Sequence, residues 1–197
     1  MAACGLDFGT SNTTLGHTGP DGPTLLPLEE AHRTIPSAIF FELGREPVIG
    51  RAATAAYVEG RSGRLMRGLK SVLGTPLMEE ATPVGRQRLR LRDVIARYLT
   101  AVKARAEAAC GEVLDSVVHG RPVNFVDGDP EADRRAEDTL REIARDVGFR
   151  EVSFQYEPIA AALDYERQVR SEEIALVADI GGGTSDFSIV RLSPERR

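Results

Sequence analysis

The chain has 197 residues, of which 42% are hydrophobic and 28% are charged. This composition is ordinary for a soluble globular protein and excludes a disordered or fibrous class. The formal net charge of -5 argues against nonspecific nucleic-acid binding as the main activity.

Two cysteines, Cys4 and Cys110, lie far apart, with no C-x-x-C motif and no histidine cluster beside them. We interpret them as small buried hydrophobes in a reducing compartment. No stretch approaches about 18 continuous apolar residues, and residues 1–16 carry no basic segment, so neither a membrane span nor a signal peptide is expected. The expected location is the cytoplasm, with neither a membrane nor a nucleic acid as partner.

The N-terminal stretch Cys4–Gly16 reads CGLDFGTSNTTLG. An apolar start, one acid, a glycine and then small hydroxyl residues predict a strand, a tight turn and a second strand. Downstream, Arg33–Phe41 predicts an apolar strand entered through a proline, Pro47–Gly50 a short partner strand, and Arg51–Val58 a helix. We interpret residues 33–112 approximately as a small subdomain inserted for shape.

The segment Arg61–Gly74 has some residues of a phosphate-binding P-loop, because glycines precede Lys70 and Ser71. It does not match the P-loop motif, however, since Leu69 separates the glycine from the lysine and no preceding strand is expected. From the residues alone, Lys70 is therefore interpreted as a solvated side chain.

The segment Arg86–Arg97 is locally basic, which raises the possibility of a nucleic-acid surface. Apolar residues from Leu91 to Val102 recur at helical spacing, however, so the arginines are interpreted as the solvated face of an amphipathic helix that ends before Gly111.

Strands and helices alternate in the second half of the chain. Asp129 and Pro130 form a helix N-cap followed by a proline at the first helical position, whereas residues 119–123 are expected to break the preceding strand. The pattern predicts an α/β fold with a mostly parallel component and antiparallel hairpins at both ends. The strands are expected at Val113–Val118 and Val152–Gln155, and the helices at residues 130–147 and Ile159–Tyr165.

The stretch Ile174–Val190 predicts a hairpin whose turn consists of three glycines. Glycines allow backbone N–H groups to converge on an anion, and the flanking Asp179 and Asp186 can approach a phosphate through a hydrated divalent cation. A purely structural turn is an equally good interpretation of this hairpin alone. The first hairpin has the same order of acid, glycine and hydroxyl residues, however, and two such loops facing each other can grip a polyphosphate from both sides.

Five stretches in order, GLDFGTSNT, RTIPSAIFF, GLKSVLG, YEPIAAAL and DIGGGTSDFSIV, resemble the nucleotide-binding domain of the DnaK-type 70-kDa heat-shock chaperones. The GRPVNF stretch is most similar to the YegD-like branch of that family. The resemblance implies an actin-like ATPase (ribonuclease H-like) fold, with a mixed sheet flanked by helices. It also implies a first lobe at residues 1–173 and the start of a second lobe, truncated, at residues 174–197.

The resemblance implies a site for ATP or ADP with Mg²⁺. Asp7 and Asp179 would hold Mg²⁺ through water. The catalytic residues implied are Lys70, Glu157, Asp179 and Thr184. The residues implied to bind the nucleotide are Gly9, Thr10, Ser11, Asn12, Gly181, Gly182, Gly183, Thr184 and Ser185. In the same comparison, the family's proline for interdomain signalling corresponds to Pro122, and its arginine partner is left open between Arg134 and Arg135.

The function expected from the resemblance is that of an ATP-binding and ATP-hydrolysing domain of a chaperone, present as an N-terminal fragment with weak activity alone. Client polypeptides and co-chaperones are the partners expected for the full-length protein. Two alternatives remain open, a small-molecule kinase of the same superfamily and a noncatalytic actin-like scaffold.

Overall fold

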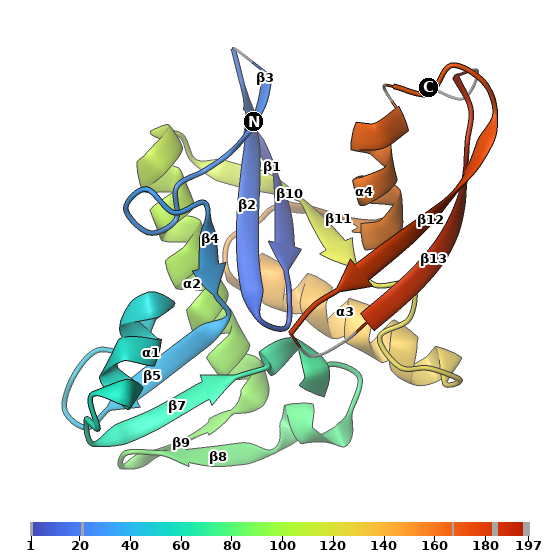
Figure 1. The fold of residues 1–197 in the computed structure, drawn as a ribbon. Helices are drawn as coiled ribbons and strands as arrows, with labels where there is room; N and C mark the ends of the chain where they lie inside the picture. The colour runs from blue at the N-terminus through green and yellow to red at the C-terminus, as the bar shows by residue number, and fades with distance from the viewer. Residues whose placement is uncertain (1, 21, 167, 183–184, 195–197) are drawn as a thin grey trace.

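The computed structural model describes residues 2–20, 22–166, 168–182 and 185–194. A six-stranded mixed sheet forms the centre, with strand order β11-β10-β1-β2-β3 and with β4 paired to β2 (Figure 1). β11, β10 and β1 are parallel, and the remaining pairs are antiparallel. The bounds are β1 Ala2–Phe8, β2 Asn12–Gly19, β3 Gly22–Leu25, β4 Thr34–Pro36, β10 Leu114–Arg121 and β11 Glu151–Tyr156.

Two long helices, α2 (Leu91–Cys110) and α3 (Pro130–Asp146), cover one face of this sheet. Alternate residues of β1, Cys4, Leu6 and Phe8, point into the core beneath them. The intervening Gly5 and Asp7 therefore lie on the opposite face. As expected, Asp129 caps α3, since its carboxylate accepts hydrogen bonds from the N–H groups of Glu131 and Ala132.

A smaller sheet, β6-β5-β7, packs against helix α1 around Phe40 and Ala53 (Figure 1). Two 3-10 turns and a hairpin then lead to α2. The bounds are β5 Ala38–Glu42, β6 Val48–Ile49, α1 Arg51–Val58, β7 Gly63–Arg67, η1 Leu69–Val72, η2 Pro76–Glu79, β8 Ala81–Val84 and β9 Gln87–Arg90. The limits of the inserted subdomain stay a prediction, although α2, within the expected range 33–112, packs in the main core.

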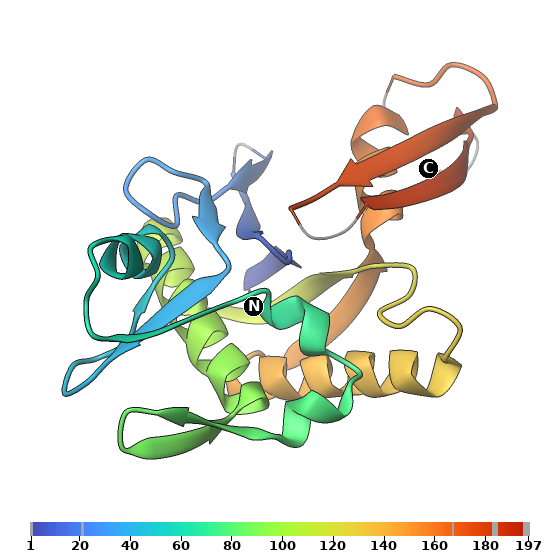
Figure 2. The same cartoon turned by 60° about the horizontal axis from the view of Figure 1, so that its bottom comes forward.

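The C-terminal unit consists of α4 (Glu157–Glu166) and the hairpin of β12 (Glu173–Ile180) and β13 (Ser185–Leu192). It packs around Ala162, Val169 and Val190 and projects beside the open face of the central sheet (Figure 2). Among the described residues, no helix combines the length and the hydropathy needed to cross a bilayer.

Three expectations from the sequence are wrong. Residues 86–90 lie in the β8–β9 hairpin and not in a helix, because they pair in register with residues 81–84. Strand β10 continues through Arg121 and is not broken at residue 119, because it pairs with β11 as far as Tyr156. Cys110 is only half-buried at the end of α2, whereas Cys4 is buried.

Candidate functional site

The tips of the two acid-glycine-hydroxyl hairpins lie against each other, although they are far apart in sequence (Figure 1). A Cβ atom built on Gly182 would lie 2.3 Å from Ser11 Oγ and 3.2 Å from Ser11 Cβ. The second loop therefore needs glycine at this position in order to approach the first. The predicted Gly183 and Thr184 lie outside the described residues.

The first loop also depends on a glycine. The Gly9 N–H donates a hydrogen bond to the Asn12 carbonyl oxygen at 2.9 Å, and a Cβ on Gly9 would come within 2.5 Å of that oxygen. No side chain fits at position 9 at that separation. The Gly9–Asn12 hydrogen bond closes the turn, and residues 10 and 11 lie at its tip.

A chain of buried hydroxyl groups forms hydrogen bonds to the backbone of the first loop. The sequence alone did not predict this chain. Ser37 Oγ donates to the Gly9 carbonyl at 2.7 Å and lies 2.9 Å from Thr13 Oγ1, which in turn lies 2.9 Å from the Tyr98 hydroxyl. Because a carbonyl only accepts, the protons run from Tyr98 through Thr13 and Ser37 to Gly9.

The backbone N–H of Ser37 also donates to the Ser11 carbonyl at 2.8 Å. This contact divides the expected strand 33–41 at Ser37 into β4 and β5. The detectable signal was a serine that interrupts an apolar run.

Lys70 and Glu157 form an ion pair, with 2.5 Å between Lys70 Nζ and Glu157 Oε1. Their side chains are only 12% and 20% exposed, so the interpretation of Lys70 as a solvated side chain is wrong. Gly68, with φ of 66°, turns the chain from β7 into η1, where Lys70 lies. A strand thus does precede this glycine, contrary to expectation.

Glu157 stands at the junction of β11 and α4, beside the glycine at position 120. A Cβ on Gly120 would lie 3.4 Å from Glu157 Cγ, which is an ordinary van der Waals distance, so the Glu157 side chain lies directly over the end of β10.

The electrostatics identify a cluster of three carboxylates, Asp7, Glu157 and Asp179, around Lys70. Asp7 keeps exposed surface, yet loss of surrounding water in the cleft raises its pKa; Asp179 raises it further and Lys70 opposes both. Burial likewise raises the pKa of Glu157, against the effect of Lys70 and in the same direction as Asp7 and Asp179. Ionised carboxylates therefore repel one another in this cleft.

The cluster lines a cleft of about 690 Å³ between the open face of the central sheet and the α4–β12 unit. An adjoining pocket of about 230 Å³ adds Pro122 and Asp186, which lies opposite Asp179 in the hairpin register. Within the described residues, no set of three or more histidine, cysteine or acidic side chains is arranged to ligate a metal.

The other predicted residues surround these. Thr10 is half-buried, and Asn12 begins β2 as an exposed residue. Gly181 is exposed in the second turn, and the exposed Ser185 begins β13.

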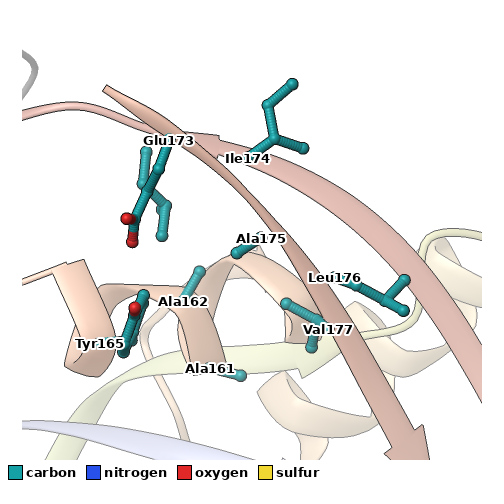
Figure 3. Close-up of a pocket in the computed structure, with 9 residues that line it drawn as sticks. Ala161, Ala162, Tyr165, Glu173, Ile174, Ala175, Leu176 and Val177 are labelled. Atoms are coloured by element: carbon teal, nitrogen blue, oxygen red, sulfur yellow. The ribbon is translucent and has the colours of Figure 1, made fainter. Parts of the chain in front are cut away.

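A second hollow of about 470 Å³ lies between α4 and β12 (Figure 3). Its walls are mainly apolar, with Tyr165 and Glu173 as the polar members, and it contains none of the predicted site residues. We therefore assign the candidate site to the cleft with the carboxylate cluster.

Arg121 was not among the residues predicted for the site, although it lies next to Pro122. Its Nε donates to the Pro122 carbonyl at 3.0 Å, and its side chain is 8% exposed. Arg135 instead forms an exposed pair with Glu131 at 3.8 Å. The arginine that donates to the Pro122 carbonyl is thus its immediate neighbour. Which downstream arginine, Arg134 or Arg135, corresponds to the family's signalling arginine stays open.

Comparisons with known proteins identify the family of this chain. The family model described as Hsp70 protein matches residues 79–195, more than half of the chain. The chain belongs to the Hsp70 protein family. The mixed sheet flanked by helices is accordingly the actin-like ATPase fold of the Hsp70 family.

Two curated Hsp70 relatives align with 97% of the chain. The Chaperone protein HscA homolog of Laribacter hongkongensis (strain HLHK9) is 31% identical, and the Chaperone protein HscA of Edwardsiella ictaluri (strain 93-146) is 29% identical. The chain spans about a third of their length, 32% and 33%. Assignment to the YegD-like branch stays a prediction.

Proposed function

We propose that the protein carrying this Hsp70 chain is an ATP-hydrolysing chaperone, and that residues 1–197 supply the phosphate side of its nucleotide site. The observation that carries the proposal is the contact between the two glycine loops, whose flanking Asp7 and Asp179 line the same cleft as Glu157, the ion-pair partner of Lys70. Phosphoryl transfer needs positioning and charge neutralisation more than covalent chemistry, and this arrangement provides both.

The two loops would bind the phosphate oxygens through their backbone N–H groups. Three carboxylates around one lysine fit a divalent cation, because burial, and to a lesser extent their mutual repulsion, raises the pKa of Asp7 and Glu157, and a bound cation would offset both effects. Mg²⁺ would be held by Asp7 and Asp179 through water, and it would neutralise charge on the phosphates. No direct protein cage is needed for such a hydrated ion.

In the proposed reaction, a water oxygen forms a bond to the γ-phosphorus while the bond from that phosphorus to the β-phosphate oxygen breaks. Glu157 orients the water, and its contact with Lys70 fixes the carboxylate. Lys70 lies within reach of the same space and stabilises the charge on the γ-phosphate. The water's proton leaves with the phosphate product or passes to a nearby carboxylate.

Client polypeptides and co-chaperones are proposed partners, on the ground that the aligned relatives carry the name chaperone. A cytoplasmic location is proposed as well, supported by the free thiols of Cys4 and Cys110.

The test is Asp179→Asn in the intact protein. We expect single-turnover ATP hydrolysis to fall by about 100-fold or more, because a charge that stabilises the transition state is lost, whereas the Kd for ATP changes much less. Rapid-quench kinetics and calorimetry measure the two quantities. Asp138→Asn, on the exposed side of α3, is the matched control. Wild-type turnover in Asp179→Asn would contradict the proposed role.

A further inference from the structure

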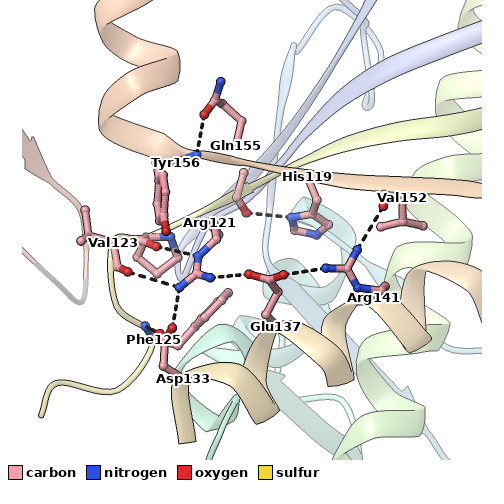
Figure 4. A network of polar contacts seen from close by, with 12 residues as sticks. His119, Arg121, Val123, Phe125, Asp133, Glu137, Arg141, Val152, Gln155 and Tyr156 are labelled. Atoms are coloured by element: carbon pink, nitrogen blue, oxygen red, sulfur yellow. Dashed lines mark hydrogen bonds and ion pairs between the residues drawn. The ribbon is translucent and has the colours of Figure 1, made fainter. Parts of the chain in front are cut away.

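Arg121 ends strand β10 with a buried guanidinium group that is bound on every side (Figure 4). Nη2 lies 2.7 Å from Asp133 Oδ2, and Nη1 pairs with Glu137; both acids come from α3. Nη2 also donates to the Val123 carbonyl at 3.2 Å, in addition to the bond from Nε to Pro122. Four of the five N–H donors of the planar guanidinium are thus paired.

Two aromatic rings enclose the same group. Arg121 Cζ lies 5.1 Å from the ring centroid of Phe125 and 5.1 Å from that of Tyr156. Tyr156 is opposite Arg121 in the β10–β11 register. A planar guanidinium stacks well on the face of an aromatic ring. The compact ammonium group of a lysine makes a weaker contact in the same position.

A second arginine repeats these contacts one step farther from the cleft. Arg141 Nη2 lies 2.5 Å from Glu137, its Nη1 donates to the Val152 carbonyl at 3.2 Å, and its Cζ lies 4.7 Å from the Phe154 ring centroid. The two arginines and the two acids balance in charge. The network therefore acts by geometry rather than by a net electric field.

The residues that Arg121 holds adjoin the carboxylate site. Tyr156 directly precedes Glu157, and Pro122 and Val123 line the small pocket together with Glu157 and Asp179. Arg121 itself does not line that pocket. Arg121 therefore contacts the site only indirectly, through the Tyr156 ring and the loop 122–125.

We propose that Arg121 is a positioning residue, which fixes the backbone of Tyr156 and of the loop 122–125 and so sets where the Glu157 carboxylate points. The inference rests on the proposed function, in which Glu157 orients the attacking water. A displacement of about 1 Å at a reacting group can slow chemistry by about 100-fold, and Arg121 is the contact that prevents such a displacement.

The experiment uses Arg121→Lys in the intact protein, because lysine keeps the charge and loses the fork and the ring stacking. Single-turnover ATP hydrolysis should fall by about 10-fold to 100-fold, with the Kd for ATP changed by less than about threefold. Tyr156→Leu should act in the same direction, and it leaves no buried charge unpaired if Arg121→Lys fails to fold. Arg141→Lys is the matched control, and hydrolysis should stay within about twofold of the parent.

A double-mutant cycle separates positioning from general destabilisation. In a Glu157→Gln background, Arg121→Lys should lower hydrolysis by less than about twofold further, because the group that it positions is already gone. A full additional loss in that background, or an equal loss in Arg141→Lys, would overturn the inference. Absence of hydrolysis in the parent, or wild-type turnover in Glu157→Gln, would instead overturn the proposed function together with the inference.

Discussion

At the scale of single residues, Asp7 and Glu157 are held in positions that oppose their ionisation. The pKa of Asp7 is raised by loss of surrounding water and by Asp179. The folded state then binds a proton more tightly than the unfolded chain, in which the pKa is about 3.9. The free energy of unfolding therefore falls as the pH rises from the ordinary carboxyl pKa through the raised one. A lower free energy of unfolding of this kind is common at sites that bind a ligand.

We predict that Asp7→Asn removes part of this pH dependence. Relative to the parent, Tm without nucleotide should be unchanged near pH 4 and higher at pH 7; the gain is small, since exposed surface screens the charge. Binding of Mg²⁺ with ATP should weaken by about 10-fold or more. Thermal unfolding across pH 4 to 8 and calorimetry measure these changes. The control Asp138→Asn should keep the parent's pH dependence, and a lower Tm for Asp7→Asn at pH 7 would refute the argument.

At the scale of elements, one turn depends on two segments that are distant in sequence. The β1–β2 turn carries the first glycine loop, β4 and β5 contribute Ser37 between them, and α2 contributes Tyr98 from the opposite side of the core. Tyr98 is fully buried, and burial raises its pKa to about 12, so its hydroxyl remains a donor at physiological pH. Packing of α2 is thereby connected to the shape of the loop.

Tyr98→Phe should lower the free energy of unfolding by about 1–2 kcal/mol, because the hydroxyl partners in the core, Thr13 and the Pro36 carbonyl, lose a donor. Urea denaturation of the variant and the parent provides the measurement. Tyr57→Phe is the control, since Tyr57 is 61% exposed on α1. Equal urea midpoints for Tyr98→Phe and the parent would show that the hydroxyl chain adds no stability.

At the scale of the whole molecule, the β12–β13 hairpin has one packed face and one open face. Ala175, Val177 and Val190 pack toward α4, whereas apolar side chains on the other face are 65–77% exposed. These residues are Ile174, Leu176, Ile180, Phe187 and Ile189. An apolar sheet face of this kind promotes association.

Residues 1–197 expressed alone should therefore self-associate, and Ile189→Lys should shift the equilibrium toward monomer by about 10-fold, because a charge replaces buried apolar area. Sedimentation velocity over a concentration series measures the change. Val58→Lys, at a position on α1 that is 78% exposed, is the control and should leave association unchanged. A parent that stays monomeric at all concentrations would contradict the prediction.

Features coded by neighbouring residues could be predicted from the sequence. The structure confirms features that depend on contacts within a few residues: the first acid-glycine-hydroxyl turn, the strands of both hairpins, the Asp129 cap and the alternation of strands and helices. Gly183 and Thr184 of the second turn lie outside the described residues. The order of the motifs along the chain also indicates the Hsp70 family.

Only the tertiary structure decided how these parts meet. The Lys70–Glu157 pair joins residues 87 positions apart, and the contact of Gly182 with Ser11 spans almost the whole chain. Strand β10 extends past its apolar run because β11 pairs with it as far as Tyr156, and Arg121 is buried because two acids and two rings enclose it. The sequence by itself determined the residues that can bind phosphate, and long-range packing determined which of them share one cleft.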